Sequence, residues 1–248
     1  MVENKTEIKI SSAGFGYVKR GDPLMILNNI SLEFCAGDFI GIVGLNGVGK
    51  STFLRSLCGL QPLLNGSVFI EGENIEDLEP EELARKVSIV LTERIGGFNL
   101  TAYDVVAAGQ LPYTDSFHRI SDVHKKIISA SIERCGVGPH VHKPVNELSD
   151  GLFQKTIIAK SLAQQTPIML LDEPSAFLDY ASKHELFTLL RQLAGNDRKC
   201  VLVSSHDLNI ILRYCNRLLV ITDGRAEMIP VEKAMEHEGF RAIGGNYL

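Results

Sequence analysis

The sequence predicts an α/β fold: a core with a mostly parallel sheet, an N-terminal antiparallel β subdomain and an inserted α-helical subdomain. Three patterns lead to this prediction. Short apolar runs alternate with helical patterns along much of the chain, near period-two alternation dominates its first part, and a central stretch shows helical spacing without a convincing strand. Strands that alternate with helices are typical of parallel sheets.

The predicted strands fall into two groups. Ile8–Gly16 and Leu27–Phe34 alternate with a period close to two and have Gly and Asn turns between them, which indicates an antiparallel sheet. The second group, expected in the parallel sheet, consists of Asp38–Val43, Ser67–Ile70, Val87–Leu91, Ile168–Leu171, Cys200–Val203 and Arg217–Thr222. Helical spacing in Ala102–Gly109 and Asp122–Cys135 predicts the helical insertion.

The length of 248 residues suits one large α/β domain with a small inserted subdomain. We expect a single domain over residues 1–228, with the helical subdomain at about 97–150 inside it. Residues 229–248 form a C-terminal tail whose pattern is too weak to assign to a helix or strand.

Charge and cysteine content narrow the functional class. The chain carries 25 basic and 30 acidic residues, a net charge of −5, with no basic run that would follow a nucleic acid backbone, so no nucleic acid partner is expected. The five cysteines are scattered and lack C-x-x-C spacing, which favours reduced thiols over a zinc site or disulfides. The N-terminus lacks a signal-peptide pattern and no apolar stretch is long enough to span a bilayer, so a membrane role would require a partner.

A phosphate-binding loop is the strongest motif. It consists of Gly44, Leu45, Asn46, Gly47, Val48, Gly49, Lys50, Ser51 and Thr52, and it fits the pattern G-x-x-x-x-G-K-[ST]. The loop follows the strand predicted at Asp38–Val43 and precedes a helical pattern at Thr52–Cys58. Glycines allow backbone N–H groups to face a polyphosphate, Lys50 supplies a cation to the β/γ oxygens, and Ser51 offers a hydroxyl to Mg²⁺.

An acidic pair ends a later strand. Ile168–Leu171 is apolar, and Asp172 and Glu173 follow it directly. This places Asp172 at the carboxyl edge of the predicted sheet, where it can hold Mg²⁺ directly or through water. Glu173 can orient and deprotonate the water that attacks a γ-phosphate. The two carboxylates therefore predict a nucleotide-hydrolysing site.

A third motif lies upstream of the acidic pair. The stretch Asn146–Lys155 precedes a helical run at Thr156–Gln165, and within it Ser149 is well placed as an N-cap, so its hydroxyl and the following N–H groups predict an anion site. Ser149 stands 23 residues before Asp172. Together these motifs resemble the ATP-binding subunits of ABC transporters, whose signature motif LSGGQ occupies this position, and the resemblance covers about residues 6–228.

The resemblance implies a P-loop NTPase core that binds ATP and Mg²⁺ and acts as an ATPase. The implied catalytic residues are Lys50, Glu173 and His206, the last corresponding to the switch histidine of the family. The implied signature, which acts across a dimer on ATP held by the other subunit, is Ser149, Asp150 and Gly151. Asp179, in Ser175–Asp179, corresponds to the D-loop at the dimer interface. Tyr17 corresponds to the aromatic residue that stacks on adenine, with Phe15 as the alternative.

The chain departs from the family pattern at two places. The family usually has a glutamine after the strand predicted at Val87–Leu91, and Thr92 or Glu93 stands there instead. Either oxygen can serve Mg²⁺, so we expect slower or differently coupled hydrolysis. In the signature, Asp150 replaces a glycine and Leu152 replaces the glutamine. The charge of Asp150 should weaken phosphate binding unless its side chain turns away.

One segment resembles a branch of the family. Asn99–Tyr113 and the upstream Leu78–Arg85 resemble importers of iron-siderophore, haem and cobalamin complexes, although Gln110 replaces a frequent arginine. The resemblance implies a second copy of the chain, integral-membrane permease subunits and, indirectly, an extracytoplasmic solute-binding protein as partners. It also implies a position on the cytoplasmic face of the membrane.

Other functions stay open at the level of sequence. An exporter subunit is contradicted only by the region Gly109–Tyr113. An ABC-type ATPase of translation or DNA maintenance is disfavoured, because the chain has one phosphate loop and no sustained heptads. A phosphotransferase is least favoured, since no motif for a second substrate is visible.

Overall fold

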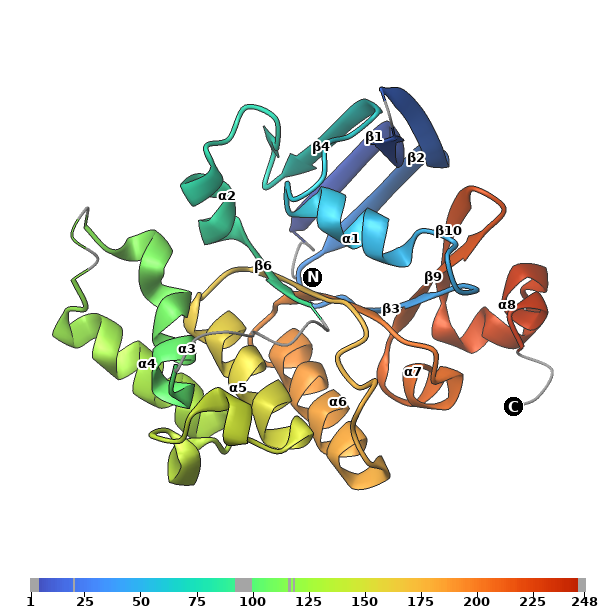
Figure 1. Ribbon diagram of the computed structural model, residues 1–248. Helices are drawn as coiled ribbons and strands as arrows, with labels where there is room; N and C mark the ends of the chain where they lie inside the picture. Colours follow the sequence, from blue (N-terminus) through green and yellow to red (C-terminus); the bar gives the residue numbers. More distant parts are fainter. Residues whose placement is uncertain (1–4, 20, 92–99, 116, 118, 245–248) are drawn as a thin grey trace.

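Two sheets and a set of helices make up the fold in the computed structural model, which describes residues 5–19, 21–91, 100–115, 117 and 119–244 (Figure 1). One sheet has four strands in the order β2-β1-β4-β5, and the other has six in the order β10-β9-β3-β8-β7-β6. Within these ranges, no helix combines the length and the apolar character needed to cross a bilayer.

The four-stranded sheet is antiparallel. Its strands are β1 (Thr6–Lys19), β2 (Asp22–Cys35), β4 (Asn65–Ile70) and β5 (Glu73–Asn74). The two predicted antiparallel strands are therefore confirmed, but the assignment of Ser67–Ile70 to the parallel sheet was wrong. Ile70 pairs with Ile8 and Val68 with Ile10, and all four side chains are buried together. A run of four apolar residues carries no information about its partner, and this long-range packing decides it.

The six-stranded sheet contains the remaining strands: β3 (Phe39–Val43), β6 (Val87–Val90), β7 (Ile168–Leu171), β8 (Cys200–Ser204), β9 (Arg217–Thr222) and β10 (Arg225–Pro230). Every neighbouring pair is parallel except β9 and β10. That hairpin turns at Asp223 and Gly224, which have φ values of 48° and 76° and form the Asp-Gly turn that suits a two-residue hairpin. Strand β10 was missed by the sequence prediction.

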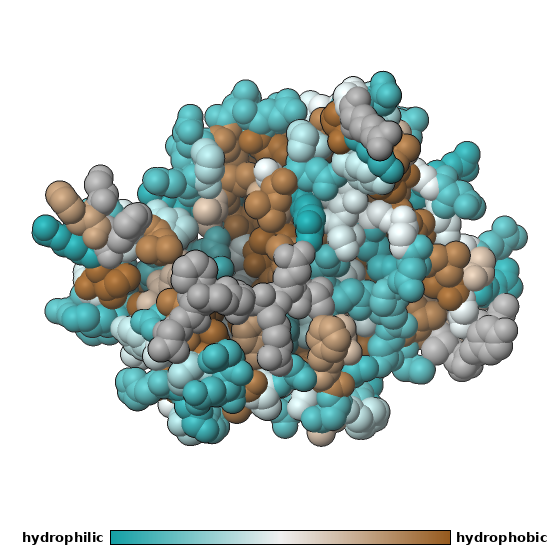
Figure 2. Space-filling model, viewed as in Figure 1, coloured by the Kyte–Doolittle hydropathy of each residue, from teal (hydrophilic) through white to brown (hydrophobic). Residues whose placement is uncertain are grey.

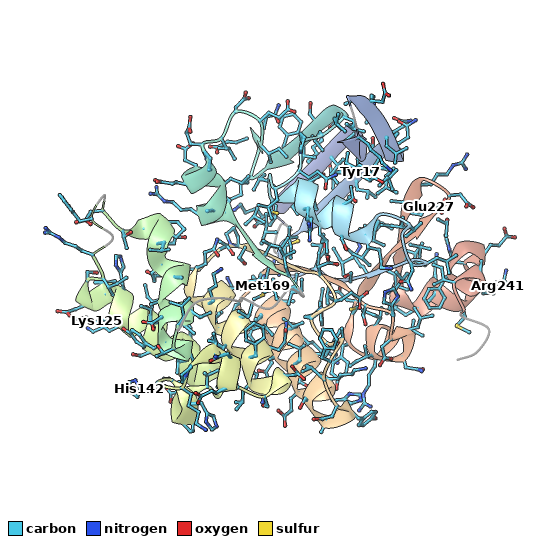
Figure 3. All side chains as sticks on the ribbon, in the orientation of Figure 1. Tyr17, Lys125, His142, Met169, Glu227 and Arg241 are labelled. Atoms are coloured by element: carbon cyan, nitrogen blue, oxygen red, sulfur yellow. The ribbon has the colours of Figure 1, made fainter. Side chains whose placement is uncertain are left out.

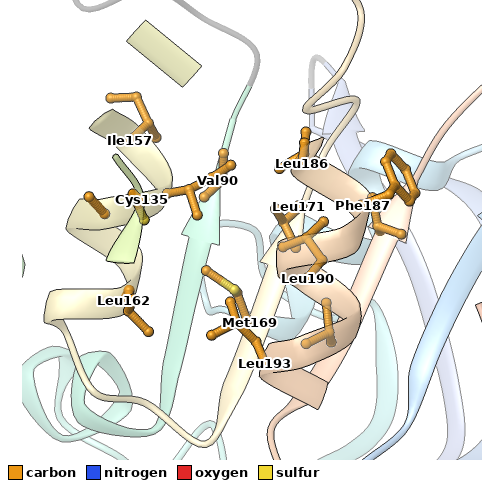
Figure 4. Close-up of a cluster of buried hydrophobic side chains, with 14 of the residues drawn as sticks. Val90, Cys135, Ile157, Leu162, Met169, Leu171, Leu186, Phe187, Leu190 and Leu193 are labelled. Atoms are coloured by element: carbon orange, nitrogen blue, oxygen red, sulfur yellow. The ribbon is translucent and has the colours of Figure 1, made fainter. Parts of the chain in front are cut away.

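Alternation along the buried strands separates two cores. In β7, Met169 and Leu171 face one core, whereas Ile168 and Leu170 face the other, because successive side chains point to opposite sides of a sheet. Figure 4 shows the first of these cores, in which side chains from α5 (Asp150–Ala163) and α6 (Tyr180–Gly195) pack onto β6 and β7. The second core contains α1 (Lys50–Leu57), which lies between the two sheets.

The central part of the chain is helical. It comprises α3 (Ala102–Ala107), η1 (Ala108–Tyr113), α4 (Asp122–Arg134), η2 (Gly138–His140) and η3 (Val145–Glu147), and α2 (Pro80–Lys86) and α7 (Leu208–Tyr214) lie elsewhere in the chain. Capping boxes at Thr101 and Ser121 begin α3 and α4, in agreement with the predicted helices.

The segment that resembles the importer branch is docked on α5. A Cβ atom at Gly109 would lie 2.3 Å from the carbonyl oxygen of Lys160, so only glycine allows this approach. Gln110 is buried and donates a hydrogen bond to the carbonyl of Ala163, and the hydroxyl of Tyr113 donates to the carbonyl of Gln164 at 2.9 Å. These residues therefore fasten η1 to the carboxyl end of α5.

The C-terminal segment folds against the six-stranded sheet. It contains η4 (Val231–Glu236) and α8 (Glu238–Ala242), and α8 lies beside β9 (Figure 1). Phe240 is completely buried in the core that also contains α6 and α7. Nδ1 of His237 accepts the N–H of Phe240 at 3.2 Å and caps α8. The sequence pattern gave no assignment here, because the two helices are too short to show a period.

Replacement of Phe240 by alanine tests this packing. Removal of a fully buried phenylalanine typically lowers the free energy of unfolding by about 3–5 kcal/mol. Met235, in the same segment, is 48% exposed, so its replacement by alanine should change that free energy by about 0.5 kcal/mol or less. Urea denaturation of the two variants measures both effects. Equal effects would mean that the segment does not pack on the core.

Candidate functional site

The phosphate-binding loop connects β3 to the N-terminus of α1, as the sequence predicts. Gly47 and Gly49 have φ values of 77° and 111°, in the left-handed region that favours glycine. A Cβ atom at Gly49 would also lie 2.5 Å from Cγ2 of Ile26. Gly49 is the N-cap of α1, so the free N–H groups of the first helical turn face the loop.

Lys50 lies inside this loop. It is only 7% exposed, and its Nζ donates hydrogen bonds to the carbonyl oxygens of Gly44 at 2.8 Å and Leu45 at 3.2 Å. Burial lowers the pKa of Lys50, while the nearby carboxylates of Glu173 and Asp172 raise it in part. The ammonium group is thus held at the carboxyl edge of the sheet, next to the acidic pair.

The acidic pair follows β7 at that same edge. The N–H of Asp172 donates to the carbonyl of Val90 at 2.9 Å, which extends the pairing with β6 by one residue. Asp172 is buried, and its Oδ1 accepts a hydrogen bond from the hydroxyl of Ser204 at 2.8 Å. Glu173 then leaves the sheet with a φ of 49°, a left-handed value that is uncommon outside glycine.

Ser204 is a residue that the sequence analysis missed. It is the last residue of β8, is completely buried, and its Oγ also accepts the N–H of Glu173 at 2.9 Å. Because Leu171 pairs with Val203 in parallel register, the next residues of the two strands lie side by side. A serine at the end of a strand next to β7 was the available signal, but strand order is not readable from the sequence alone.

His206 lies against Glu173. Nε2 of His206 is 3.1 Å from Oε1 of Glu173, and the histidine side chain is 51% exposed whereas that of Glu173 is 18% exposed. Burial raises the pKa of Glu173, and Asp172 adds to this effect, while His206 and Lys50 oppose it. A carboxylate with a raised pKa is a stronger base than an exposed one, which is the property that general-base catalysis uses.

A pocket of about 270 Å³ brings the three predicted catalytic residues together with Tyr17 and much of the phosphate loop. The residues that line it are Tyr17, Ile26, Asn46, Gly47, Gly49, Lys50, Ser51, Thr52, Glu173 and His206. Tyr17, labelled in Figure 3, is 40% exposed at the pocket. Phe15 is completely buried and packs on Phe53 with ring centroids 4.9 Å apart, so of the two candidate aromatics only Tyr17 can meet a ligand.

The predicted signature residues do not line this pocket. Ser149 caps α5, its Oγ accepting the N–H of Leu152 at 3.4 Å, and both Ser149 and Asp150 are exposed. A Cβ atom at Gly151 would lie 3.5 Å from Oγ of Ser182, so α5 begins next to the first turn of α6. Within one chain, the signature and the phosphate loop are therefore separate features.

Asp179 has a structural partner in the same chain. It caps α6, with Oδ1 accepting the N–H of Ser182 at 2.8 Å and Oδ2 accepting its hydroxyl at 3.1 Å. These hydrogen bonds lower the pKa of Asp179. The exposed aromatic side chains of Phe177 and Tyr180 flank it.

The donors available for Mg²⁺ are hard oxygen atoms, which is the set that this ion prefers. Ser51 is exposed at the pocket, and Asp172 is buried next in sequence to Glu173, which lines the pocket. Thr92 and Glu93, predicted as further ligands, lie outside the described residues. Among the residues that the structure does describe, no group of three or more His, Cys, Asp or Glu side chains could hold a metal ion.

Residues 27–176 match the model of the ABC transporter family. The chain belongs to this family. The resemblance seen in the sequence is thereby confirmed, and the cassette is an ATPase that binds ATP.

The ABC cassette has curated relatives along much of its length. It is 40% identical over 197 residues to the ABC transporter ATP-binding protein MJ0873 of Methanocaldococcus jannaschii, covering 79% of this chain and 68% of that protein. It is 31% identical to the ferric enterobactin transport ATP-binding protein FepC of Escherichia coli, covering 91% and 82%. It is 34% identical to the cobalamin import ATP-binding protein BtuD of Halobacterium salinarum, covering 81% of this chain but only half of that protein.

Solved cassettes have the same fold. A structure described as the dimeric structure of MJ0796, a bacterial ABC transporter cassette, superposes with a TM-score of 0.79 at 27% identity, covering 90% of this chain and 98% of that one. The predicted fold class is therefore confirmed.

The raised pKa of Glu173 predicts a pH-dependent stability. The folded state binds this proton more tightly than the unfolded state, so the free energy of unfolding falls as pH rises from the unfolded pKa through the folded pKa. Glu173→Gln removes the ionisable carboxyl group, and with it this fall in the free energy of unfolding. We expect the variant to unfold at a higher urea concentration than the wild type at about pH 8, with a smaller difference at about pH 4.

The exposed Glu185 provides the control. Glu185→Gln should shift the urea midpoint little at either pH, because surface substitutions usually change stability by about 0.5 kcal/mol or less. If Glu173→Gln behaved in the same way, burial of Glu173 would not weaken the folded state.

Proposed function

We propose that this cassette is the ATP-hydrolysing subunit of an importer, acts as a dimer around two ATP molecules, and drives uptake of an iron-siderophore, haem or cobalamin complex through a membrane permease. The observation that carries the ATPase chemistry is that Lys50, Glu173 and His206 line the same pocket. The importer class is supported by relatives named for ferric enterobactin transport and cobalamin import.

The phosphates of ATP would lie over the N-terminus of α1. Backbone N–H groups of the loop around Gly47 and Gly49 would contact the phosphate oxygens, with the N-terminal dipole of the helix favouring negative charge. Lys50 now donates to the carbonyls of Gly44 and Leu45, and its ammonium would turn to the β/γ oxygens when these arrive. Tyr17, on β1, would stack on the adenine.

Glu173 and His206 would act on the attacking water. Glu173 would orient the water in line with the γ-phosphate and take its proton, which its burial and raised pKa favour. His206, at 3.1 Å from Glu173, would contact the γ-phosphate and hold the carboxylate in place. Ser51 and Asp172 would hold Mg²⁺, which supplies positive charge against the phosphate oxygens.

A second copy would supply the signature residues. Ser149, Asp150 and Gly151 lie at the N-terminus of α5, a fourteen-residue helix whose first N–H groups suit an anion, but they lie outside the pocket of their own chain. A facing copy would bring its Ser149 to the exposed side of the ATP, and the similarity to a dimeric cassette supports this arrangement. Asp179 and the exposed Phe177 next to it would then face the partner copy.

A permease would dock near α1 and α2. Figure 2 shows apolar side chains gathered over this part of the molecule. Leu60, just after α1, and Leu111 in η1 are exposed by 61% and 45%. Helix α2 contacts both the end of α1 and η1. Leu83 of α2 packs at Gly59, just after α1, and Nε of Arg85 donates to the carbonyl of Pro112 in η1 at 2.8 Å. Exposed apolar patches are common where another protein binds, which supports this location. On this account the cassette lies at the cytoplasmic side of the membrane, and an extracytoplasmic solute-binding protein delivers the cargo.

Co-expression with a candidate importer permease tests the proposal. We expect the two proteins to purify together and, in proteoliposomes with a solute-binding protein, to import a ferric siderophore, haem or cobalamin when ATP is present. Glu173→Gln should lower ATP turnover about 10²–10⁴-fold without loss of ATP binding, as expected for loss of a general base. Glu185→Gln, on the exposed face of α6, should retain turnover.

Three results would contradict the proposal. Recovery of ribosomes or DNA with the cassette in place of a permease would indicate another class of ABC ATPase. Export of the cargo would reverse the direction assigned here. Turnover that survives in Glu173→Gln would remove Glu173 from its role.

A further inference from the structure

Ser204 holds both members of the acidic pair. Its hydroxyl donates to Oδ1 of Asp172 at 2.8 Å and accepts from the backbone N–H of Glu173 at 2.9 Å. A serine hydroxyl has one proton to donate, and Asp172 takes it, so the direction of both hydrogen bonds is set. Ser204 is completely buried, and both bonds are therefore shielded from water.

The bond to Glu173 occurs where the chain leaves the sheet. The N–H of Asp172 is still paired with Val90 of β6, but Glu173 has a left-handed φ of 49° and its N–H turns to β8 instead. A non-glycine residue keeps such a backbone conformation only when its surroundings impose it. Two hydrogen bonds hold it here: the Ser204 hydroxyl accepts the N–H of Glu173, and the N–H of Ala176 donates to the carbonyl of Glu173 at 3.2 Å. The direction of the Glu173 side chain follows from that backbone.

The bond to Asp172 occurs on the other side of the same hydroxyl. One oxygen atom thus sets the position of a carboxylate and of the peptide that carries the next carboxylate. The neighbouring serine does not share this role, because Oγ of Ser205 accepts the N–H of Asp207 at 3.1 Å and shapes the following turn. Rotation of the Ser204 side chain would break both of these hydrogen bonds together.

We propose that Ser204 is a positioning residue for ATP hydrolysis, which fixes Glu173 and Asp172 relative to each other without contacting ATP. This role rests on the proposed function of the pocket. A shift of about 1 Å in a reacting group can lower a rate by about 100-fold, whereas binding of ATP through the loop, Lys50 and Tyr17 does not depend on Ser204. Loss of Ser204 should therefore lower kcat and leave KM for ATP nearly unchanged.

The test compares Ser204→Ala with Ser204→Thr and with a matched control. Ser88 is also buried in the same sheet, and its hydroxyl donates to the carbonyl of Ile168 at 3.3 Å and accepts hydrogen bonds from Ser161 and Thr166. Ser88→Ala thus removes a buried hydrogen-bonding hydroxyl at the opposite end of β7 from the acidic pair. For each purified full-length variant we would measure kcat, KM for ATP and the thermal midpoint.

We expect Ser204→Ala to lower kcat about 10–100-fold, with KM for ATP within about two-fold of the wild type. Ser204→Thr, which keeps the hydroxyl, should recover most of this loss. Ser88→Ala should lower the thermal midpoint to a similar degree and keep its kcat.

The outcomes separate this role from the function of the site. If the wild type hydrolyses ATP and Ser204→Ala keeps the same kcat, or loses no more kcat than Ser88→Ala, only the role of Ser204 is overturned. A rise in KM at constant kcat would also overturn it, since the residue would then act on binding. A folded Ser204→Thr variant whose kcat stays as low as that of Ser204→Ala would also overturn the role of Ser204. A wild-type protein that lacks turnover together with its permease would overturn the proposed function and this role with it.

Discussion

Parallel pairing of β7, β8 and β3 is the constraint on which the site depends. In register, Leu171 lies beside Val203 and Ser204 beside Ile42, so the three strands end at one edge of the sheet. The residues that follow these strands are the acidic pair, the histidine turn and the phosphate loop. Strand pairing therefore brings together groups that are more than a hundred positions apart in the sequence.

Burial at this edge sets the electrostatics. It lowers the pKa of Lys50 and raises that of Glu173, which means that both charged forms are less well solvated here than in water. The opposite charges of Lys50 and Glu173 partly offset the lost solvation of each other, and Asp172 adds a second negative charge. The site therefore carries charges that a polyphosphate and its cation would complement, with the acidic pair held by the hydrogen bonds of Ser204.

Much of this arrangement could be predicted from the sequence, because it depends on local patterns. The phosphate loop, the acidic pair after Ile168–Leu171 and the cap at Ser149 are each readable within a few residues. The errors arose where long-range packing decides. Strand β4 joined the antiparallel sheet through Ile8 and Ile10, and Ser204 gained its partners only from the order of strands. The role of Thr92 or Glu93 stays a prediction, since both lie outside the described residues.

We propose that one chain builds half of a composite site: the pocket of one copy contains Lys50, and Ser149 comes from the other copy. Mixing two inactive variants tests it most directly. Lys50→Ala and Ser149→Arg each damage both sites of a homodimer, but a mixed dimer contains one site with both lesions and one site with neither. We expect ATP turnover to return on mixing, up to about a quarter of the wild-type value for random pairing and independent sites. A mixture as inactive as either variant alone, although mixed dimers form, would contradict it.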